Sequence, residues 1–198
     1  MTDSSPTPMS STRNDSAETF ELPPFLTVGH SNRSLNEFIE LLTDTGTEVV
    51  VDVRRLPGSN RHPQFNADTL TTELAESGIE LRRLDGLTGR RPVSRTVPFE
   101  TNAWWQNRSF HNYADHALSE DFRTDLATLI TWGEGERCAL MCAEAVWWRC
   151  HRRIIADHLL ARDLKVSHIL GEGHIVPAKL SDGAEVGSDG TLTYPANS

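Results

Sequence analysis

Short apolar runs alternate with amphipathic segments in the first part of the chain. Residues 25–29 (FLTVG) form an apolar run that ends in glycine, and apolar side chains then recur at the i, i+3, i+4 and i+7 spacing of a helix. Ser34 and Glu37 form the S-x-x-E pattern of a capping box, and Gly46 ends this helix. Residues 48–53 (EVVVDV) are β-branched with almost no polar alternation, which is typical of a strand buried on both faces of a parallel sheet.

The alternation of strands and helices continues toward the C-terminus. Such an order of elements implies right-handed crossovers and an α/β fold. We therefore expect a single layered domain with a mainly parallel sheet of about five strands flanked by helices. The later predicted elements are helices over 67–77, 119–133 and 147–162 and strands over 79–84, 137–142 and 166–170.

Both ends of the chain lack this pattern. Residues 1–22 are rich in Ser, Thr, Pro and Asp without apolar periodicity, so burial cannot offset the entropy of ordering them. We expect a disordered leader over 1–22, the α/β domain over 23–180 and a flexible acidic tail over 181–198, in which Leu192 and Tyr194 could dock.

Charge and apolar run length narrow the class of protein. The chain of 198 residues has 19 Lys and Arg against 28 Asp and Glu, a net charge of −9, of which 1–22 and 181–198 each carry −3. The acidity therefore belongs mostly to the ends and does not exclude an anionic ligand. No apolar run approaches the roughly 20 residues of a membrane span, and residues 1–22 lack the basic-then-apolar pattern expected of a secretory signal. We expect a cytoplasmic protein without a membrane partner.

Three cysteines lie in one short segment. Cys138, Cys142 and Cys150 are neither evenly spaced nor dispersed, unlike the framework of a disulfide-stapled secreted domain. We expect reduced thiols and no structural disulfide.

Polar and charged residues follow the predicted strands. In a parallel sheet the carboxyl ends of the strands meet at one edge, where ligands bind. The candidates are His30 and Ser31 after the first strand, Asp52 and Arg54 after the second, Arg90 and Arg91 after the third, Cys142 and Glu144 after the fourth, and His151 and Arg152 in the opening turns of the next helix.

The connection 85–112 is longer than the usual strand-to-helix loop of about 2–6 residues. It combines arginines with Trp104 and Trp105, a mixture that can hold a phosphate and stack a base or sugar ring. We interpret it as a lid or binding loop. The alternative is that both tryptophans pack into the core.

Six stretches of the chain resemble the family of the domain of unknown function 488. The resemblance covers about residues 25–176 and is most specific in C-A-E followed by C-H-R. It implies a compact cytosolic α/β domain and brings no known reaction with it. The stretches are TVGHS (27–31), VDVRRLPGS (51–59), HPQFN (62–66), GLTGRRP (86–92), FHNYADH (110–116) and LMCAEAVWWRCHRRIIADHL (140–159).

Cys142 is a candidate nucleophile. A thiolate at the end of a parallel strand is stabilised by the following helix dipole and by Arg149 or Arg152. A phosphatase loop would need arginine where the chain has Trp148, and a glycine-rich cradle that is missing between Cys142 and Cys150. The alternative is a buried, inert thiol.

A metal site is a further possibility. Cys142, Glu144, Cys150 and His151 are potential ligands, and His30 could join them. The spacing C-x7-C is wider than that of common zinc sites. Cys150 and His151, as neighbours on a helix separated by about 100°, would not readily face one ion. We therefore predict no metal and no cofactor.

These residues favour an enzyme, a hydrolase or transferase, that acts on a phosphorylated or nucleotide-like small molecule at the strand ends. The alternatives are a non-catalytic nucleotide or nucleic-acid binding module, and a structural or metal-binding domain. Duplex DNA is a disfavoured partner, because no basic recognition helix is present. Arginines such as Arg54 could instead form structural ion pairs with Asp52. The predicted catalytic residues are His30, Glu144, His151 and Cys142, and the predicted substrate-binding residues are Ser31, Asp52, Arg54, Arg90, Arg91, Trp105 and Arg152.

Overall fold

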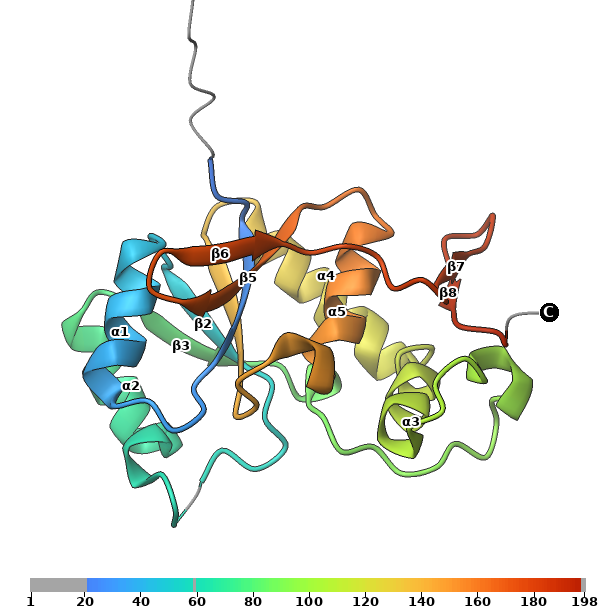
Figure 1. Cartoon of the computed structure of the whole chain (residues 1–198), viewed down its shortest axis with the longest axis horizontal. Coiled ribbons are helices and arrows are strands. Elements are labelled where there is room, and N and C mark those ends of the chain that lie inside the picture. Colours follow the sequence, from blue (N-terminus) through green and yellow to red (C-terminus); the bar gives the residue numbers. More distant parts are fainter. Residues whose placement is uncertain (1–20, 59, 197–198) are drawn as a thin grey trace, which may run out of the picture.

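The central layer of the molecule is a sheet, shown edge-on with its covering helices in Figure 1. The computed structural model describes residues 21–58 and 60–196, so most of the predicted leader 1–22 lies outside the described residues. Within these ranges the sheet has six strands in the order β3-β2-β4-β1-β5-β6. The strands are β1 (Phe25–Gly29), β2 (Val49–Asp52), β3 (Glu80–Arg83), β4 (Cys138–Cys142), β5 (Val166–Gly171) and β6 (His174–Pro177).

Strands β1 to β5 pair in parallel, as the alternation predicts, and β6 adds an antiparallel edge that was not predicted. Strands β1, β2 and β4 end at nearly the same height, because Gly29 pairs with Cys142 and Asp52 pairs with Met141. The carboxyl ends of three neighbouring strands, β2, β4 and β1, therefore meet at one place.

Two helical layers cover the two faces of the sheet. Helices α1 (Leu35–Asp44) and α2 (Ala67–Glu76) cover one face, and α3 (Arg108–His116), α4 (Glu120–Gly133) and α5 (Arg152–Leu160) cover the other (Figure 1). The predicted capping box of α1 is confirmed, with the Ser34 hydroxyl accepting from the Glu37 amide. No helix of the described ranges is long and apolar enough to cross a membrane.

The side chains of β2 show why this strand has no polar alternation. Val49 and Val51 pack into the core beneath α3, α4 and α5, whereas Val50 packs into the core beneath α1 and α2. All three valines are fully buried. The prediction of a strand buried on both faces is confirmed.

Two predictions about helices are wrong. The connection 85–112 is interpreted from the sequence as a lid or binding loop without a helix, but α3 begins within it at Arg108, where Asn107 caps the helix by accepting from the Ser109 amide. The last helix was expected from residue 147 but begins at Arg152. Trp147–Arg149 is a separate 3-10 turn, and Cys150 has extended backbone, with φ −133° and ψ 147°.

The C-terminal segment is packed against the domain, in contrast to the flexible tail expected from residue 181. It forms the hairpin β7 (Glu185–Val186) and β8 (Leu192–Thr193). Leu192 and Tyr194 are buried, and the Tyr194 hydroxyl donates to the Asp157 carboxylate at 2.9 Å. The two apolar side chains that could dock therefore do, and they hold an otherwise polar segment in place.

Candidate functional site

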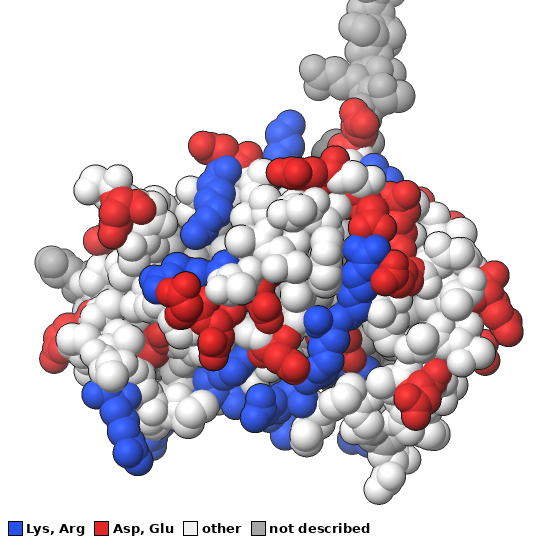
Figure 2. Space-filling view, turned by 180° about the vertical axis from the view of Figure 1, so that it is seen from behind, with Lys and Arg blue, Asp and Glu red and all other residues white. Residues whose placement is uncertain are grey.

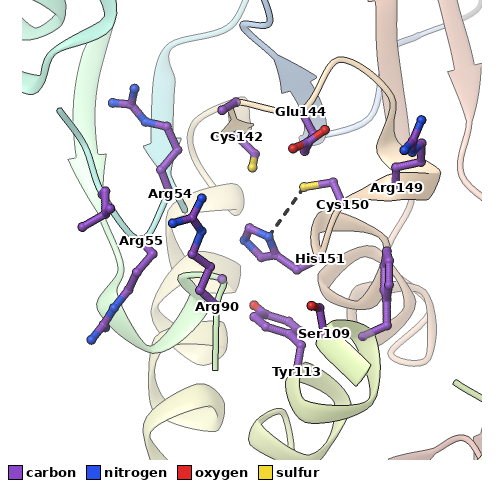
Figure 3. A pocket seen from close by; sticks show the side chains of 14 residues that line it. Arg54, Arg55, Arg90, Ser109, Tyr113, Cys142, Glu144, Arg149, Cys150 and His151 are labelled. Carbon is purple, nitrogen blue, oxygen red and sulfur yellow. Dashed lines mark hydrogen bonds between the residues drawn. The ribbon is translucent and has the colours of Figure 1, made fainter. Parts of the chain in front are cut away.

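A pocket of about 280 Å³ opens at the carboxyl ends of β2 and β4 (Figure 3). Arg54, Arg55 and Arg90 lie on one side of it, and Glu144, Arg149 and Cys150 lie on the other. Five predicted site residues line it, namely Arg54, Arg90, Cys142, Glu144 and His151. The other lining residues are Arg55, Leu56, Gly89, Ser109, Phe110, Tyr113, Ala143, Arg149 and Cys150.

The wall above the pocket depends on a close approach between two backbones. His30 and Ser31 donate their amides to the carbonyl oxygens of Cys142 and Ala143, which extends the β1–β4 pairing beyond the strands. A Cβ atom on Gly29 would lie 2.0 Å from the carbonyl oxygen of Glu144. Only glycine therefore allows the segment after β4 to cross the end of β1.

Two buried thiols share the floor of the pocket. A hydrogen bond to Cys150, together with burial, raises the pKa of Cys142 well above its ordinary value. Burial also works to raise the pKa of Cys150. The hydrogen bond from Cys142 and the neighbouring His151 and Arg152 outweigh it, and the pKa of Cys150 is lowered.

The ring of His151 is held from two directions. Its Nε2 lies 3.0 Å from the Val53 carbonyl oxygen, which can only accept, so in the neutral ring Nε2 donates the proton. Nδ1 is then the acceptor nitrogen, and it lies 3.6 Å from the Cys150 sulfur. A Cβ on Gly89 would come within 2.7 Å of Nδ1, so the backbone of residue 89 packs directly against the ring.

The sequence-based argument that Cys150 and His151 would not face one ion is wrong. One ligand atom from each of Cys142, Cys150 and His151 lies within 4.8 Å of the other two. The helical separation does not apply, because Cys150 is extended and α5 begins only at Arg152. Glu144 and His30 lie outside this cluster.

The side chain of Arg54 is hydrogen-bonded to other groups of the protein. Its guanidinium makes two bonds to the Asp52 carboxylate, at 2.9 and 2.7 Å, and donates to the Phe65 carbonyl oxygen at 2.8 Å. Both charged side chains are at most 5% exposed. This geometry corresponds to the structural ion pair that the sequence left open as the alternative to anion binding.

Three other guanidinium groups at the pocket have no such partners. Arg55, Arg90 and Arg149 are exposed, and none has a side-chain hydrogen bond or ion pair to the described residues. They come from three separate segments. In Figure 2 basic side chains gather along the lower edge of the molecule, the edge toward which β1 descends in Figure 1. The three unpaired arginines therefore add positive charge to the lining of the pocket.

Residues 34–159 match the family described as Domain of unknown function DUF488. The chain belongs to the DUF488 family. The matched segment runs from α1 to α5 and contains every residue that lines the pocket, whereas β1 and β5 lie outside it. No curated protein and no solved structure matches the chain.

The other predicted site residues of this DUF488 domain do not line the pocket. His30 is buried, stacks on Phe65 with ring centroids 4.2 Å apart, and has its pKa lowered to about 4, mainly by burial. Ser31 directs its hydroxyl to Asn32. Arg91 donates to the Thr88 carbonyl oxygen and closes its own loop.

Trp105 and Arg152 are also packed inside the DUF488 domain. Trp105 is 7% exposed and stacks on Phe110, as in the alternative that placed the tryptophans in the core. Arg152 is 1% exposed and donates to the Cys150 sulfur at 3.3 Å and to the Glu144 carbonyl oxygen at 2.6 Å. Arg152 therefore links the Cys150 sulfur to the backbone of Glu144.

Sequence reasoning did not place Cys150, Arg55 and Arg149 among the binding or catalytic residues. The signal for Cys150 was its position in C-H-R, in the opening turns of the helix predicted over 147–162. Arg55 carried the same strand-end signal as Arg54, so the sequence had no means to tell which of the two side chains is engaged. Ser109 and Tyr113 were missed because α3 was missed.

Proposed function

We propose that this protein binds a phosphorylated or nucleotide-like small molecule in the strand-end pocket and acts on it as an enzyme. The observation that carries the proposal is that Arg55, Arg90 and Arg149, all unpaired within the described ranges, line a cavity that also has thiol, imidazole and carboxylate groups. A guanidinium group that has no partner within the protein can form charge-assisted hydrogen bonds with a bound anion.

The backbone of the anion site supports this assignment. Arg90 adopts a left-handed conformation, with φ +56°, which costs a non-glycine residue of order 1 kcal/mol or more. Such strain is found where a side chain must be aimed at a ligand. The volume of about 280 Å³ lies near the lower end for ligand pockets, which favours a small phosphate ester over a polymer.

The remaining pocket residues suit acid–base chemistry. Glu144 is exposed, its carboxylate has no side-chain partner among the described residues, and it lies on the same side of the pocket as Cys150 (Figure 3). His151 presents Nδ1 as a proton acceptor. In this proposal Glu144 and His151 transfer protons, Arg55, Arg90 and Arg149 bind the anion, and Arg54 and Arg152 hold the pocket walls.

Anion binding is tested by calorimetric titration with inorganic phosphate and with a nucleoside monophosphate. We expect Arg90→Ala and Arg149→Ala each to weaken binding roughly 10- to 150-fold, because one charge-assisted contact contributes about 1.5–3 kcal/mol. The matched control is Arg95→Ala, which removes an exposed arginine that does not line the pocket. Equal affinity in the wild type and in the Arg90 and Arg149 variants contradicts the proposal.

Catalysis is tested separately with a panel of phosphate monoesters and diesters, followed by release of phosphate or alcohol. We expect Glu144→Gln to lower kcat about 100-fold or more while binding changes little, as for loss of an acid–base group. A wild-type protein that binds the ligands and turns over none of them would be the non-catalytic binding module.

We also propose the cytoplasm as the compartment. Cys138, Cys142 and Cys150 are all free thiols. A thiol pair in hydrogen-bond contact persists in the reduced form where glutathione and thioredoxin keep thiols reduced.

A further inference from the structure

We propose that Cys142, Cys150 and His151 bind a divalent metal ion of the zinc class at the floor of the pocket. This inference rests on the proposed function and deepens it, because it places a Lewis acid beside the anion site. With the metal bound, Nδ1 of His151 is a ligand instead of a proton acceptor, and proton transfer is left to Glu144. It stands on the position of three ligand atoms, each within 4.8 Å of the other two.

The donor set selects the kind of metal. Two cysteine sulfurs and one imidazole nitrogen are soft to borderline ligands, which suit Zn²⁺ and disfavour Mg²⁺ and Ca²⁺. The metal–ligand distances of about 2.3 Å for sulfur and about 2.0–2.1 Å for nitrogen require the three atoms to draw together slightly. The segment between Cys142 and Cys150 has no α-helix to resist such a shift.

The surroundings of the ligands are those of a metal site. The Nε2–H of His151 donates to the Val53 carbonyl oxygen at 3.0 Å, which directs the Nδ1 lone pair toward the sulfurs. A ligand histidine usually makes this second hydrogen bond. Arg152 donates to the Cys150 sulfur at 3.3 Å and stabilises a thiolate there.

The number of protein ligands indicates a catalytic rather than a structural site. Structural zinc usually has four protein ligands, whereas catalytic zinc has three and leaves a position for water or substrate. All three ligand residues line the cavity. The open position would therefore face the pocket that Arg55, Arg90 and Arg149 line, where an anion oxygen or a water molecule can bind.

The experiment is a titration of the full, reduced, metal-free chain with Co²⁺ alone, followed by absorption spectroscopy. We expect one equivalent to bind, with sulfur-to-cobalt charge-transfer absorption and the intense visible bands of tetrahedral Co²⁺, and Zn²⁺ to displace it. Cys142→Ser and Cys150→Ser should each lose at least half of the charge-transfer intensity and weaken binding at least 10-fold. His151→Asn should weaken binding while keeping the charge-transfer band.

The matched control is Cys138→Ser. Cys138 is a buried cysteine at the opposite end of β4, outside the cluster, so this variant should keep the full cobalt spectrum. Co²⁺ binding without charge-transfer absorption would overturn the proposal. So would a loss of charge-transfer intensity in the Cys138 variant equal to that in the Cys142 and Cys150 variants. So would wild-type affinity no higher than that of the double variant Cys142→Ser/Cys150→Ser.

A second measurement covers the case in which the serine variants do not fold. The wild-type chain is treated with iodoacetamide with and without Zn²⁺, and labelled cysteines are located by mass spectrometry. We expect Zn²⁺ to protect Cys142 and Cys150, and the absence of protection contradicts the site. Neither measurement uses an anion, so the metal site and the anion site can fail independently.

Discussion

Arg54 and Arg55 show how neighbouring arginines take different roles. Arg54 is 5% exposed and bound to Asp52, whereas Arg55 is exposed at the pocket. Removing one member of a buried ion pair leaves the other charge uncompensated, which costs about 3–5 kcal/mol. Arg54 is therefore a residue on which stability depends.

We expect Arg54→Ala to lower the free energy of unfolding by about 3–5 kcal/mol, measured by urea denaturation. Arg123→Ala is the control, because its pair with Glu120 is exposed and contributes about 0–1 kcal/mol. A fully stable Arg54→Ala protein that has lost phosphate binding would show that Arg54 acts on the ligand instead.

Gly29 is a residue whose lack of a side chain shapes the pocket. Its Cβ would meet the carbonyl oxygen of Glu144 at 2.0 Å, so Gly29→Ala must displace the segment that follows β4. We expect a loss of about 1–3 kcal/mol in the free energy of unfolding, as for other overpacking changes. Gly135→Ala, where a Cβ meets nothing within 4 Å, should stay within about 0.5 kcal/mol of the wild type.

At the scale of elements, the hairpin of β7 and β8 is tied to the domain through α5. Asp157 of α5 is buried, and it accepts from the Tyr194 hydroxyl at 2.9 Å and from the Ser181 amide at 3.0 Å. Burial raises the pKa of Asp157 against these hydrogen bonds. The C-terminal segment thus satisfies a polar group that α5 would otherwise leave buried and unpaired.

We expect Tyr194→Phe to destabilise the protein by about 1–3 kcal/mol, because one Asp157 oxygen then loses its donor in a buried place. Limited proteolysis should cleave the segment after residue 181 sooner than in the wild type. Unchanged stability together with an unchanged cleavage pattern would mean that the hairpin is held by its apolar contacts alone.

At the scale of the whole molecule, buried histidines couple folding to pH. Burial lowers the pKa of His158 and of His168 to about 3, below the ordinary value of 6.5 that applies in the unfolded chain. The unfolded state therefore binds protons first as the pH falls. The contribution of these two histidines to the free energy of unfolding is fully present above pH 6.5. It is lost progressively as the pH falls from 6.5 toward about 3.

We expect His158→Leu to reduce this acid sensitivity. The urea midpoint should fall less between pH 7 and pH 4 in the variant than in the wild type, since one such group is gone. The same comparison for the exposed His174→Leu should show no difference from the wild type. Parallel pH profiles for the wild type and His158→Leu would exclude His158 as the cause.

The sequence by itself determined the five parallel strands, the capped helix α1 and the edge where polar residues gather, because these depend on local periodicity and on chain direction. Tertiary structure decided which groups have partners. The Phe65 carbonyl oxygen accepts a hydrogen bond from the Arg54 side chain, whereas no group among the described residues bonds to the side chain of Arg55. Cys142 meets Cys150 and His151 because the chain between them forms a turn before α5 begins. Such contacts join residues far apart in sequence or depend on where a helix begins, and periodicity does not encode them.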